Sequence, residues 1–243
     1  MTILAVAAPS ETTGYTLLVA TDGAQVRAAQ RLRYRVFAEQ LGATLPSTME
    51  DVDEFDAYCD HLIIREEPGG EVVGTYRMLP PHRAAEAGRL YSDGEFDLTG
   101  LAQLRPMLVE TGRSCVHPDH RTGAVINLMW AGIARYMHLH EYRWLSGCAS
   151  VPLDDAAGVW ELARRKHLAP PAWRVRPRNP WPVRSATGKP SVPPLLKGYL
   201  RLGAWVCGAP AYDPDFACAD FYVLLSLDRV DPRYLRHFLG EVI

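Results

Sequence analysis

The 243-residue chain alternates between segments whose apolar residues have strand-like spacing and segments with helix-like spacing. Short apolar runs bounded by Gly, Pro or Asp predict strands. Longer segments with apolar residues every three to four positions predict helices. The predicted strands are 15–21, 61–66, 71–79, 107–116, 143–151 and 221–228, and the predicted helices are 22–41, 124–139, 153–167 and 194–204. This order favours one α/β domain with a mixed sheet.

The remaining segments set the expected domain boundaries. Residues 1–14 are expected to form a flexible leader, and 15–243 a single domain. Residues 81–103 show no clear period and are expected to be irregular. The stretch 168–194 contains eight prolines and predicts a basic insertion that is mostly loop or extended edge. The N-terminus resembles no signal peptide, and no apolar run approaches the roughly 20 residues that a membrane span needs.

One arginine interrupts the apolar face of the first predicted helix. At 100° per residue, Leu32 and Val36 lie on one face, and Arg33 falls inside that apolar arc. A guanidinium in this position must either meet a buried carboxylate or extend to the edge of the face. The acidic segment "EDVDEFDAYCD" (50–60) offers such a carboxylate. A structural ion pair and a role in a functional site are both open for Arg33.

The strand at 107–116 contains two charged residues, Glu110 and Arg113, in a segment whose composition predicts burial. In a regular strand their side chains would point to opposite faces. A bulge at Gly112 would bring both onto one face, as bulges beside active sites often do. A glutamate in a partly apolar cleft has a raised pKa and can accept a proton from an amine near neutral pH. A buried ion pair between the two residues is the structural alternative.

The segment that follows, "HPDHRTGAVINL", predicts a glycine-led helix start. Arg121, Gly123 and Ala124 would present a positive charge and free backbone N–H groups, which suit a phosphate. Many helices begin with a glycine turn, so this feature alone is weak. The histidines lack the clustering of metal ligands, and no metal site is expected. No GxxxxGK[ST] motif is present, so a nucleoside-triphosphate loop is not supported.

Charge is unevenly distributed along the chain. Residues 161–201 contain ten basic residues and one acid, a net charge of +9, so the rest of the chain carries −11 of the total −2. A specific anionic partner is favoured over nucleic acid, with a solvated face as the alternative. Arg164, Arg165 and Lys166 form its densest run. The five cysteines include no CxxC pair, which predicts free thiols in a reducing compartment.

These features together resemble the GCN5-related N-acyltransferase (GNAT) superfamily. "VHPDHRTGAVINL" is similar to its donor-binding loop, with one glycine where many members have two. Four groups of residues in this chain have the same spacing as the ordered residue pattern of acyl-homoserine-lactone synthases. They are Arg33 and Phe37, Asp53 and Asp56, Arg77 and Leu79-Pro80, and Glu110 and Arg113. "ETGRSCVHPDHR" and residues 193–225 look like acyl-carrier-protein:ornithine N-acyltransferases, and the resemblance covers about 15–228.

The resemblance implies a GNAT-like fold, with a mixed, mostly antiparallel sheet flanked by helices. It also implies an N-acyltransferase that moves a long acyl chain, plain or 3-hydroxylated, from acyl carrier protein to the α-amine of an amino acid, ornithine first. Glu110 would be the base, assisted by Arg113. The implied donor-binding residues are Cys115, Val116, Arg121, Gly123 and Ala124; the implied acceptor side and acidic loop consist of Arg33, Phe37, Asp53, Asp56 and Arg77.

Further expectations concern partners and rival functions. Asp53 and Asp56 would attract a cationic acceptor, and Arg77 and Arg113 would order the acidic loop or bind a carboxylate. Acyl carrier protein would dock on Arg164, Arg165 and Lys166. No cofactor beyond the acyl donor is expected, and the location is cytoplasmic, with peripheral membrane contact. The alternatives are lactone synthesis from S-adenosylmethionine, acetyl-CoA-dependent acetylation, and a non-catalytic acyl- or membrane-binding module.

The expected chemistry is direct transfer without an acyl-enzyme. Cys115 is the only thiol expected near the site, and its sequence context offers no paired base.

Overall fold

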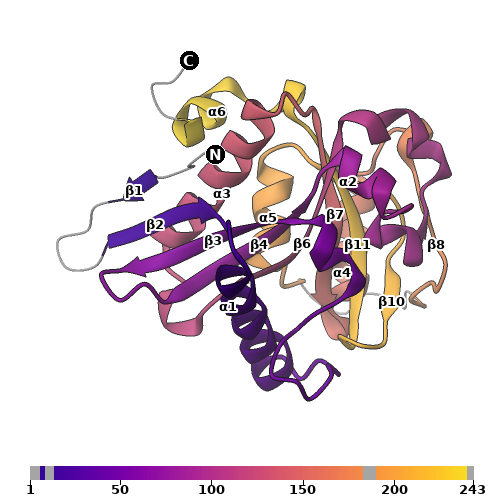
Figure 1. The fold of residues 1–243 in the computed structure, drawn as a ribbon. Helices are drawn as coiled ribbons and strands as arrows, with labels where there is room; N and C mark the ends of the chain where they lie inside the picture. Colours follow the sequence, from indigo (N-terminus) through magenta and orange to yellow (C-terminus); the bar gives the residue numbers. More distant parts are fainter. Residues whose placement is uncertain (1–5, 9–13, 183–189, 240–243) are drawn as a thin grey trace.

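A mixed sheet of nine strands forms the centre of the molecule (Figure 1). The computed structural model describes residues 6–8, 14–182 and 190–239. The strand order is β1-β2-β3-β4-β6-β7-β11-β10, with β9 paired to β11. Only the β6–β7 pair is parallel, and every other neighbouring pair is antiparallel. The expectation of a mixed, mostly antiparallel sheet is confirmed.

The strands and helices have the following bounds. The main-sheet strands are β1 Val6–Ala8, β2 Gly14–Val19, β3 Asp60–Glu67, β4 Val72–Leu79, β6 Leu108–Val116, β7 Trp144–Pro152, β9 Trp205–Val206, β10 Ala211–Asp213 and β11 Cys218–Ser226. A separate pair consists of β5 Phe96–Asp97 and β8 Arg176–Pro177. The α-helices are α1 Gly23–Tyr34, α2 Pro81–Glu86, α3 Gly123–Leu139, α4 Leu153–Lys166, α5 Pro194–Arg201 and α6 Pro232–Leu239.

Two helical layers cover the two faces of the sheet (Figure 1). Helices α3, α4 and α5 share one large hydrophobic cluster with alternate residues of the central strands, such as Tyr76 and Met78. The intervening residues face the opposite side, where α1 packs on Ile63, Val72 and Cys115. This alternation is the period of two that a strand imposes on its side chains. We refer to these sides as the α3 face and the α1 face.

Strand β6 contains a bulge that resets this alternation. Thr75 pairs with Cys115 and Arg77 with Gly112, so Tyr76 alone stands opposite the two residues Arg113 and Ser114. Arg113 has a φ of +52°, which is uncommon for a residue other than glycine. The bulge therefore lies one residue after the expected position, Gly112.

Strands β6 and β7 pair over only three residues and then separate. Their ladder runs from Leu108↔Trp144 to Glu110↔Ser146, although β6 continues to Val116 and β7 to Pro152. Just beyond the last pair, a Cβ atom on Gly147 would overlap the backbone carbonyl oxygen of Thr111. Glycine at 147 therefore permits the close approach from which the two strands diverge.

Several local predictions need correction. The first helix does not run unbroken to Leu41, because α1 passes into a π-helical turn at Arg35–Gln40, the kind of irregularity often found at functional sites. Residues 81–103, expected to be irregular, contain α2, β5 and 3₁₀ turns. The short elements β9, β10 and α6 were not expected. Strands β9 and β10, with two and three residues, give too few positions for a period to be recognised.

The two terminal expectations fall partly outside the described residues. Within the expected leader, Val6–Ala8 form β1, which pairs with β2; residues 1–5 and 9–13 are not described. Within 168–194, Pro171–Trp173 form a 3₁₀ turn and β8 pairs with β5, while 183–189 are not described. No helix in the described ranges has the length and apolar character required to cross a membrane.

Replacing Gly147 by alanine should destabilise the fold at the point where β6 and β7 separate. The new methyl group meets backbone, which cannot rotate away, so we expect a loss of about 1–3 kcal/mol in the free energy of unfolding. Gly112→Ala is the matched control, because a Cβ there meets no atom within 4 Å, and it should change stability by less than about 0.5 kcal/mol. Urea unfolding measures both, and equal losses would contradict this account of Gly147.

Candidate active site

A cavity of about 410 Å³ opens where β6 and β7 separate. Its wall includes Glu110 and Arg77 from the α1 face, and Tyr76 and Leu195 from the α3 face. The space therefore passes through the gap in the sheet from one face to the other. The remaining lining residues are Phe37, Leu41, Phe55, Cys59, Leu79, Tyr91, Thr111, Gly112, Arg113, Ser114, Cys148, Ser150, Val151, Pro152, Asp213, Phe216, Ala217, Cys218 and Asp220.

Arg33 finds the buried carboxylates that its position on the helix requires. Its side chain is 0% exposed, and its Nε donates to Oδ2 of Asp51 at 2.8 Å. Its two terminal nitrogens donate to the two oxygens of Asp56 at 2.7 and 2.9 Å. Paired, hydrogen-bonded charges avoid the desolvation penalty of an isolated buried ion. The structural ion pair with the acidic segment is thus present.

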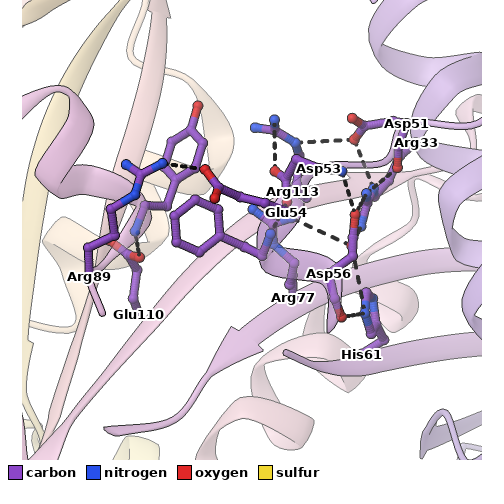
Figure 2. Close-up of polar contacts among 12 residues, drawn as sticks. Arg33, Asp51, Asp53, Glu54, Asp56, His61, Arg77, Arg89, Glu110 and Arg113 are labelled. Atoms are coloured by element: carbon purple, nitrogen blue, oxygen red, sulfur yellow. Dashed lines mark hydrogen bonds and ion pairs between the residues drawn. The ribbon is translucent and has the colours of Figure 1, made fainter. Parts of the chain in front are cut away.

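Two further arginines complete this cluster, which we call the arginine–aspartate lattice: Arg33, Arg77 and Arg113 with Asp51, Asp53 and Asp56. Arg77 pairs with Asp53 at 2.6 Å and with Asp56 at 3.5 Å. Arg113 pairs with Asp51 at 3.1 Å and with Asp53 at 3.3 Å. Figure 2 shows the arginines converging on the acidic segment from α1, β4 and β6. Arg77 and Arg113 therefore form ion pairs with the acidic loop.

The arginines of the lattice neutralise most of the negative charge of its aspartates. Burial works to raise the pKa of Asp56, but hydrogen bonds and the positive charge of Arg33 outweigh it and lower that pKa to about 2. Neither Asp53 nor Asp56 lines the cavity, and each is matched by arginines. This geometry suits bracing of the cavity wall better than attraction of a cationic acceptor.

Glu110 lies apart from the lattice. It is 4% exposed, and its two oxygens accept hydrogen bonds from the backbone N–H groups of Tyr91 at 2.6 Å and Ser92 at 3.0 Å. No ion pair to Glu110 occurs within 6–8, 14–182 and 190–239, so the buried Glu110–Arg113 pair is not formed. Burial raises its pKa, opposed by these N–H groups and by Arg77.

The bulge in β6 places the side chain of Arg113 on the α1 face of the sheet, the same face as Glu110. The guanidinium of Arg113 lies over the rings of Tyr91 at 5.2 Å and Phe216 at 4.8 Å, and both rings line the cavity. Phe37, on the π-helical turn, lines the same wall and packs edge-on against Phe216 at 5.5 Å. The site thus combines a fixed carboxyl, fixed positive charge and aromatic surface.

The thiols near the site differ from expectation. Cys115 points to the α1 face and does not line the cavity, whereas Cys59, Cys148 and Cys218 do. The expectation that Cys115 is the only nearby thiol is therefore wrong, because it considered neighbours in sequence rather than in the sheet. Burial raises the pKa of Cys59 and Cys115 to about 12 and that of Cys148 well above its ordinary value, so these thiols stay protonated. All five cysteines are free.

The end of β6 exposes backbone groups toward the gap. The N–H of His117 donates to Val73 on β4, and the carbonyl of Val116 accepts from Arg121 Nε at 3.1 Å. Because successive residues of a strand direct their backbone groups to opposite edges, the Val116 N–H faces the β7 side and the Cys115 N–H faces β4.

The start of α3 lies next along the chain. Thr122 caps this helix by accepting from the Val125 N–H at 3.4 Å, while Arg121, Gly123 and Ala124 are exposed. A side chain added at Gly123 would meet nothing within 4 Å, so the approach to the helix N-terminus is open. None of these three residues lines the cavity.

Arg164, Arg165 and Lys166 lie at the C-terminal end of α4. Arg164 and Arg165 are exposed, and both pair with Glu161. Since α4 begins at Leu153, directly after the cavity residue Pro152, this basic run lies roughly 20 Å further along the helix.

Comparison with known proteins agrees with this geometry. Residues 32–131 match the acetyltransferase (GNAT) domain family. The chain is 37% identical to an L-ornithine N(alpha)-acyltransferase of Rhodobacter capsulatus, over 94% of this chain and 96% of that protein. It is 34% identical to the enzyme of the same name from Brucella abortus, over 92% and 88% of the two chains. The chain belongs to the L-ornithine N(alpha)-acyltransferase family.

Solved structures support the fold assignment. FeeM, an N-acyl amino acid synthase from uncultured soil microbes, has a TM-score of 0.58 at 13% identity, covering 93% of this chain and 95% of its own. The AHL synthase LasI has a TM-score of 0.54 at 14% identity, covering 94% and 96%. At such identities the likeness concerns the GNAT fold. With its family, it confirms that the chain is an N-acyltransferase of the GNAT superfamily.

Several residues at the site of this N-acyltransferase were missed in the sequence. Tyr91 and Ser92, whose N–H groups hold Glu110, lie in the segment expected to be irregular. Cys148 and Asp220 project from neighbouring strands, opposite Tyr222 and Ser150 respectively. One signal in the sequence could have identified Asp220, because it is a charged residue in the otherwise apolar segment "ACADFYVLL" (217–225). The family resemblance covered this segment but did not single out Asp220.

Removing the Arg33 guanidinium should destabilise the protein strongly. Arg33→Met leaves Asp51 and Asp56 buried without their main partner, which typically costs about 3–5 kcal/mol. Arg31→Met is the matched control on the same helix, because the Arg31–Glu50 pair is exposed and should contribute less than about 1 kcal/mol. Chemical denaturation measures both variants. A loss at Arg33 no larger than at Arg31 would rule out the lattice as a determinant of stability.

Proposed function

We propose that this N-acyltransferase transfers a long acyl chain, plain or 3-hydroxylated, from acyl carrier protein to the α-amine of ornithine, giving an N-acyl-ornithine. The observation that carries the proposal is Glu110: a fixed, buried carboxyl in a cavity that passes through the gap between β6 and β7. The identity to L-ornithine N(alpha)-acyltransferases over nearly the whole chain supports ornithine as the acceptor.

In the proposed reaction Glu110 accepts a proton from the α-ammonium of the acceptor, directly or through a water. The freed amine attacks the thioester carbonyl carbon, an amide bond forms, and the carbon–sulfur bond breaks. The pantetheine thiolate leaves and takes up the second proton that the attacking nitrogen loses, while the first proton passes from Glu110 to solvent, so atoms and charges balance. The raised pKa of Glu110 brings its basicity closer to what proton removal near neutral pH requires. Arg113 assists by holding the aromatic wall and the lattice in place.

The Val116 N–H is the proposed donor to the thioester carbonyl oxygen. It faces the gap between the strands, and an N–H fixed before the reaction stabilises a developing oxyanion without reorganisation. Cys115 serves this function less well, because its N–H is directed to β4. Its thiol is also protonated and outside the cavity. These features support direct transfer from donor to amine, and the protonated thiols within the cavity support it too.

The donor's phosphate is proposed to bind at the start of α3. Gly123 and Ala124 offer exposed N–H groups at the positive end of a 17-residue helix. Arg121 lies beside them and also reaches the π-helical turn, where it donates to Gln40 at 3.0 Å. A phosphopantetheine arm held there would lead into the gap past Val116.

Arg164, Arg165 and Lys166 are proposed to contact the acidic surface of the carrier protein. Their exposure supports this contact, although Glu161 offsets part of the charge of the two arginines. We further propose that the enzyme works in the cytosol and touches the membrane peripherally, since its product is an amphiphile.

A mass-spectrometric assay with purified protein tests the proposed function. Acyl and 3-hydroxyacyl carrier proteins, and the same chains on CoA, are each offered with a pool of amino acids. We expect N-acyl-ornithine from the carrier-protein donors. In the double variant Arg164→Glu/Arg165→Glu, the KM for carrier-protein donors should rise, whereas the KM for CoA donors should not change. Turnover with acetyl-CoA alone, lactone from S-adenosylmethionine, or no product from any donor would overturn the proposal.

Glu110→Gln should abolish most turnover. Losing a general base typically costs about 100- to 10,000-fold in kcat. In the wild type, kcat/KM should rise with pH through the pKa of Glu110, which lies above that of an ordinary glutamate, because only the carboxylate accepts the proton. Glu54→Gln, an exposed acid beside the site, is the control and should keep both the rate and the acid limb. An unchanged rate in Glu110→Gln would exclude the residue as the base.

A further inference from the structure

A second cluster of acidic side chains lies at the cavity, and its carboxyl groups form no ion pairs with basic residues in the described part of the chain. Asp213 and Asp220 line the cavity, and Glu95 lies against Asp220. In the lattice each aspartate has an arginine partner. In contrast, none of these three acids forms an ion pair with an Arg, Lys or His within the described ranges. We call Glu95, Asp213 and Asp220 the unmatched acids.

Asp220 is the most enclosed of the three. It is 3% exposed, projects from the first half of β11 opposite Ser150, and lines the cavity. The one hydrogen bond that its carboxyl receives from the described residues is a long one, from Cys218 Sγ to Oδ1 at 3.5 Å. A buried carboxylate in this state is costly unless a cation or a proton reaches it.

Asp213 and Glu95 hold the rest of the cluster in place. Oδ1 of Asp213 accepts the N–H groups of Asp215 at 2.8 Å and Phe216 at 3.1 Å, which orient its carboxyl without neutralising it. Both oxygens of Glu95 are covered, and no hydrogen-bond partner meets them in the described part of the chain. Burial and the charges of Asp220 and Asp213 raise the pKa of Glu95 to about 9, which shows how poorly negative charge is compensated there.

The unmatched acids lie close to the proposed base. Ser92, whose N–H holds Glu110, contacts the thiol of Cys148 with its Oγ at 3.2 Å. The Sγ of Cys148 in turn lies within 4.8 Å of the carboxyl oxygens of Glu95 and Asp220. Cys148 therefore lies between Ser92, whose N–H binds Glu110, and the carboxyl groups of Glu95 and Asp220. Glu110 and Asp220 also line the same cavity, so one bound molecule can contact both.

We propose that Asp213 and Asp220 bind the side-chain ammonium group of a diamino acid acceptor, with Glu95 lying against Asp220. This inference rests on the proposed function and deepens it, because it names the residues that select a cationic side chain. An ammonium group donates three hydrogen bonds and brings the positive charge that the cluster lacks. A neutral side chain of the same length leaves the acids unmatched, so the site rejects it.

Paired substrates test the assignment. L-Ornithine and L-norvaline share the α-amine, the α-carboxylate and the carbon chain, and differ in the δ-ammonium group. In the wild type we expect kcat/KM for ornithine to exceed that for norvaline by about 30-fold or more, the range for losing one partner of a desolvated charge pair. Asp220→Asn should lower the ornithine value by a similar factor and leave the norvaline value unchanged or raised.

The control and the opposing outcomes separate this inference from the proposed function. Asp215→Asn removes an exposed carboxylate two residues from Asp213 and should change neither substrate's kinetics. Retained norvaline turnover shows that Asp220→Asn is folded. Equal kcat/KM for ornithine and norvaline in the wild type, or an equal loss of both in Asp220→Asn, overturns the ammonium site while leaving N-acyl transfer intact.

A metal ion is the competing occupant, because the two groups Glu95–Cys148–Asp220 and Asp213–Cys218–Asp220 each place three ligand atoms within 4.8 Å of one another. Purified wild-type protein is assayed after treatment with EDTA and after addition of Zn²⁺ or Mn²⁺. Ornithine turnover that survives EDTA supports the ammonium site. Turnover that EDTA abolishes and a metal restores overturns it. No product from any amino acid would instead contradict the proposed function itself.

Discussion

The buried guanidinium of Arg33 is the interaction on which the rest of the site depends. Its charge must be matched inside the protein, and the acids with which it pairs, Asp51 and Asp56, belong to the segment between α1 and β3. Matching it pulls that segment against the sheet. There Asp53 and Asp51 meet Arg77 from β4 and Arg113 from β6. One constraint thereby fixes a helix, a loop and two strands relative to one another, and together they form one wall of the cavity.

The second constraint is the bulge in β6, which determines which side chains of β6 line the cavity wall. Without the extra residue, Arg113 would point away from Glu110 and the lattice would lose one of its arginines. Strands β6 and β7 separate after Glu110↔Ser146, just before the bulge, and the gap gives the cavity access to both faces of the sheet. In the proposed reaction, a thioester that approaches past Val116 and an amine that approaches Glu110 would reach the same space by different entrances. The arginines of the lattice pair with its three aspartates, whereas two of the unmatched acids, Asp213 and Asp220, line this space without a basic partner among the described residues.

Sequence reasoning succeeded where one residue violated a strong local rule. A charged residue on an apolar helix face predicted both its burial and its partners in 50–60, because few other solutions exist for Arg33. Glu110 and Arg113 were recognised in the same way, from charges in a buried strand. The order of the long strands and helices was also correct, since each presents enough turns or alternations for its period to be read.

What could not be predicted depended on neighbours that only the folded sheet brings together. Glu110 is held by backbone N–H groups of Tyr91 and Ser92, and any residue type could supply these. Cys148 and Asp220 meet across β7 and β11, and no spacing in the chain records that register. The bulge was placed at Gly112 because glycine tolerates unusual backbone angles, but Arg113 adopts the positive φ, held by its ion pairs.

The most direct test of the account is a structure of the protein with ornithine and a non-hydrolysable acyl-pantetheine thioether. We predict that the acyl-pantetheine threads the gap between β6 and β7 with its carbonyl oxygen at the Val116 N–H. The α-amine of ornithine should lie within hydrogen-bond reach of Glu110 or of one intervening water. A donor bound outside the gap, or an α-amine on the side of the sheet away from Glu110, would contradict the account.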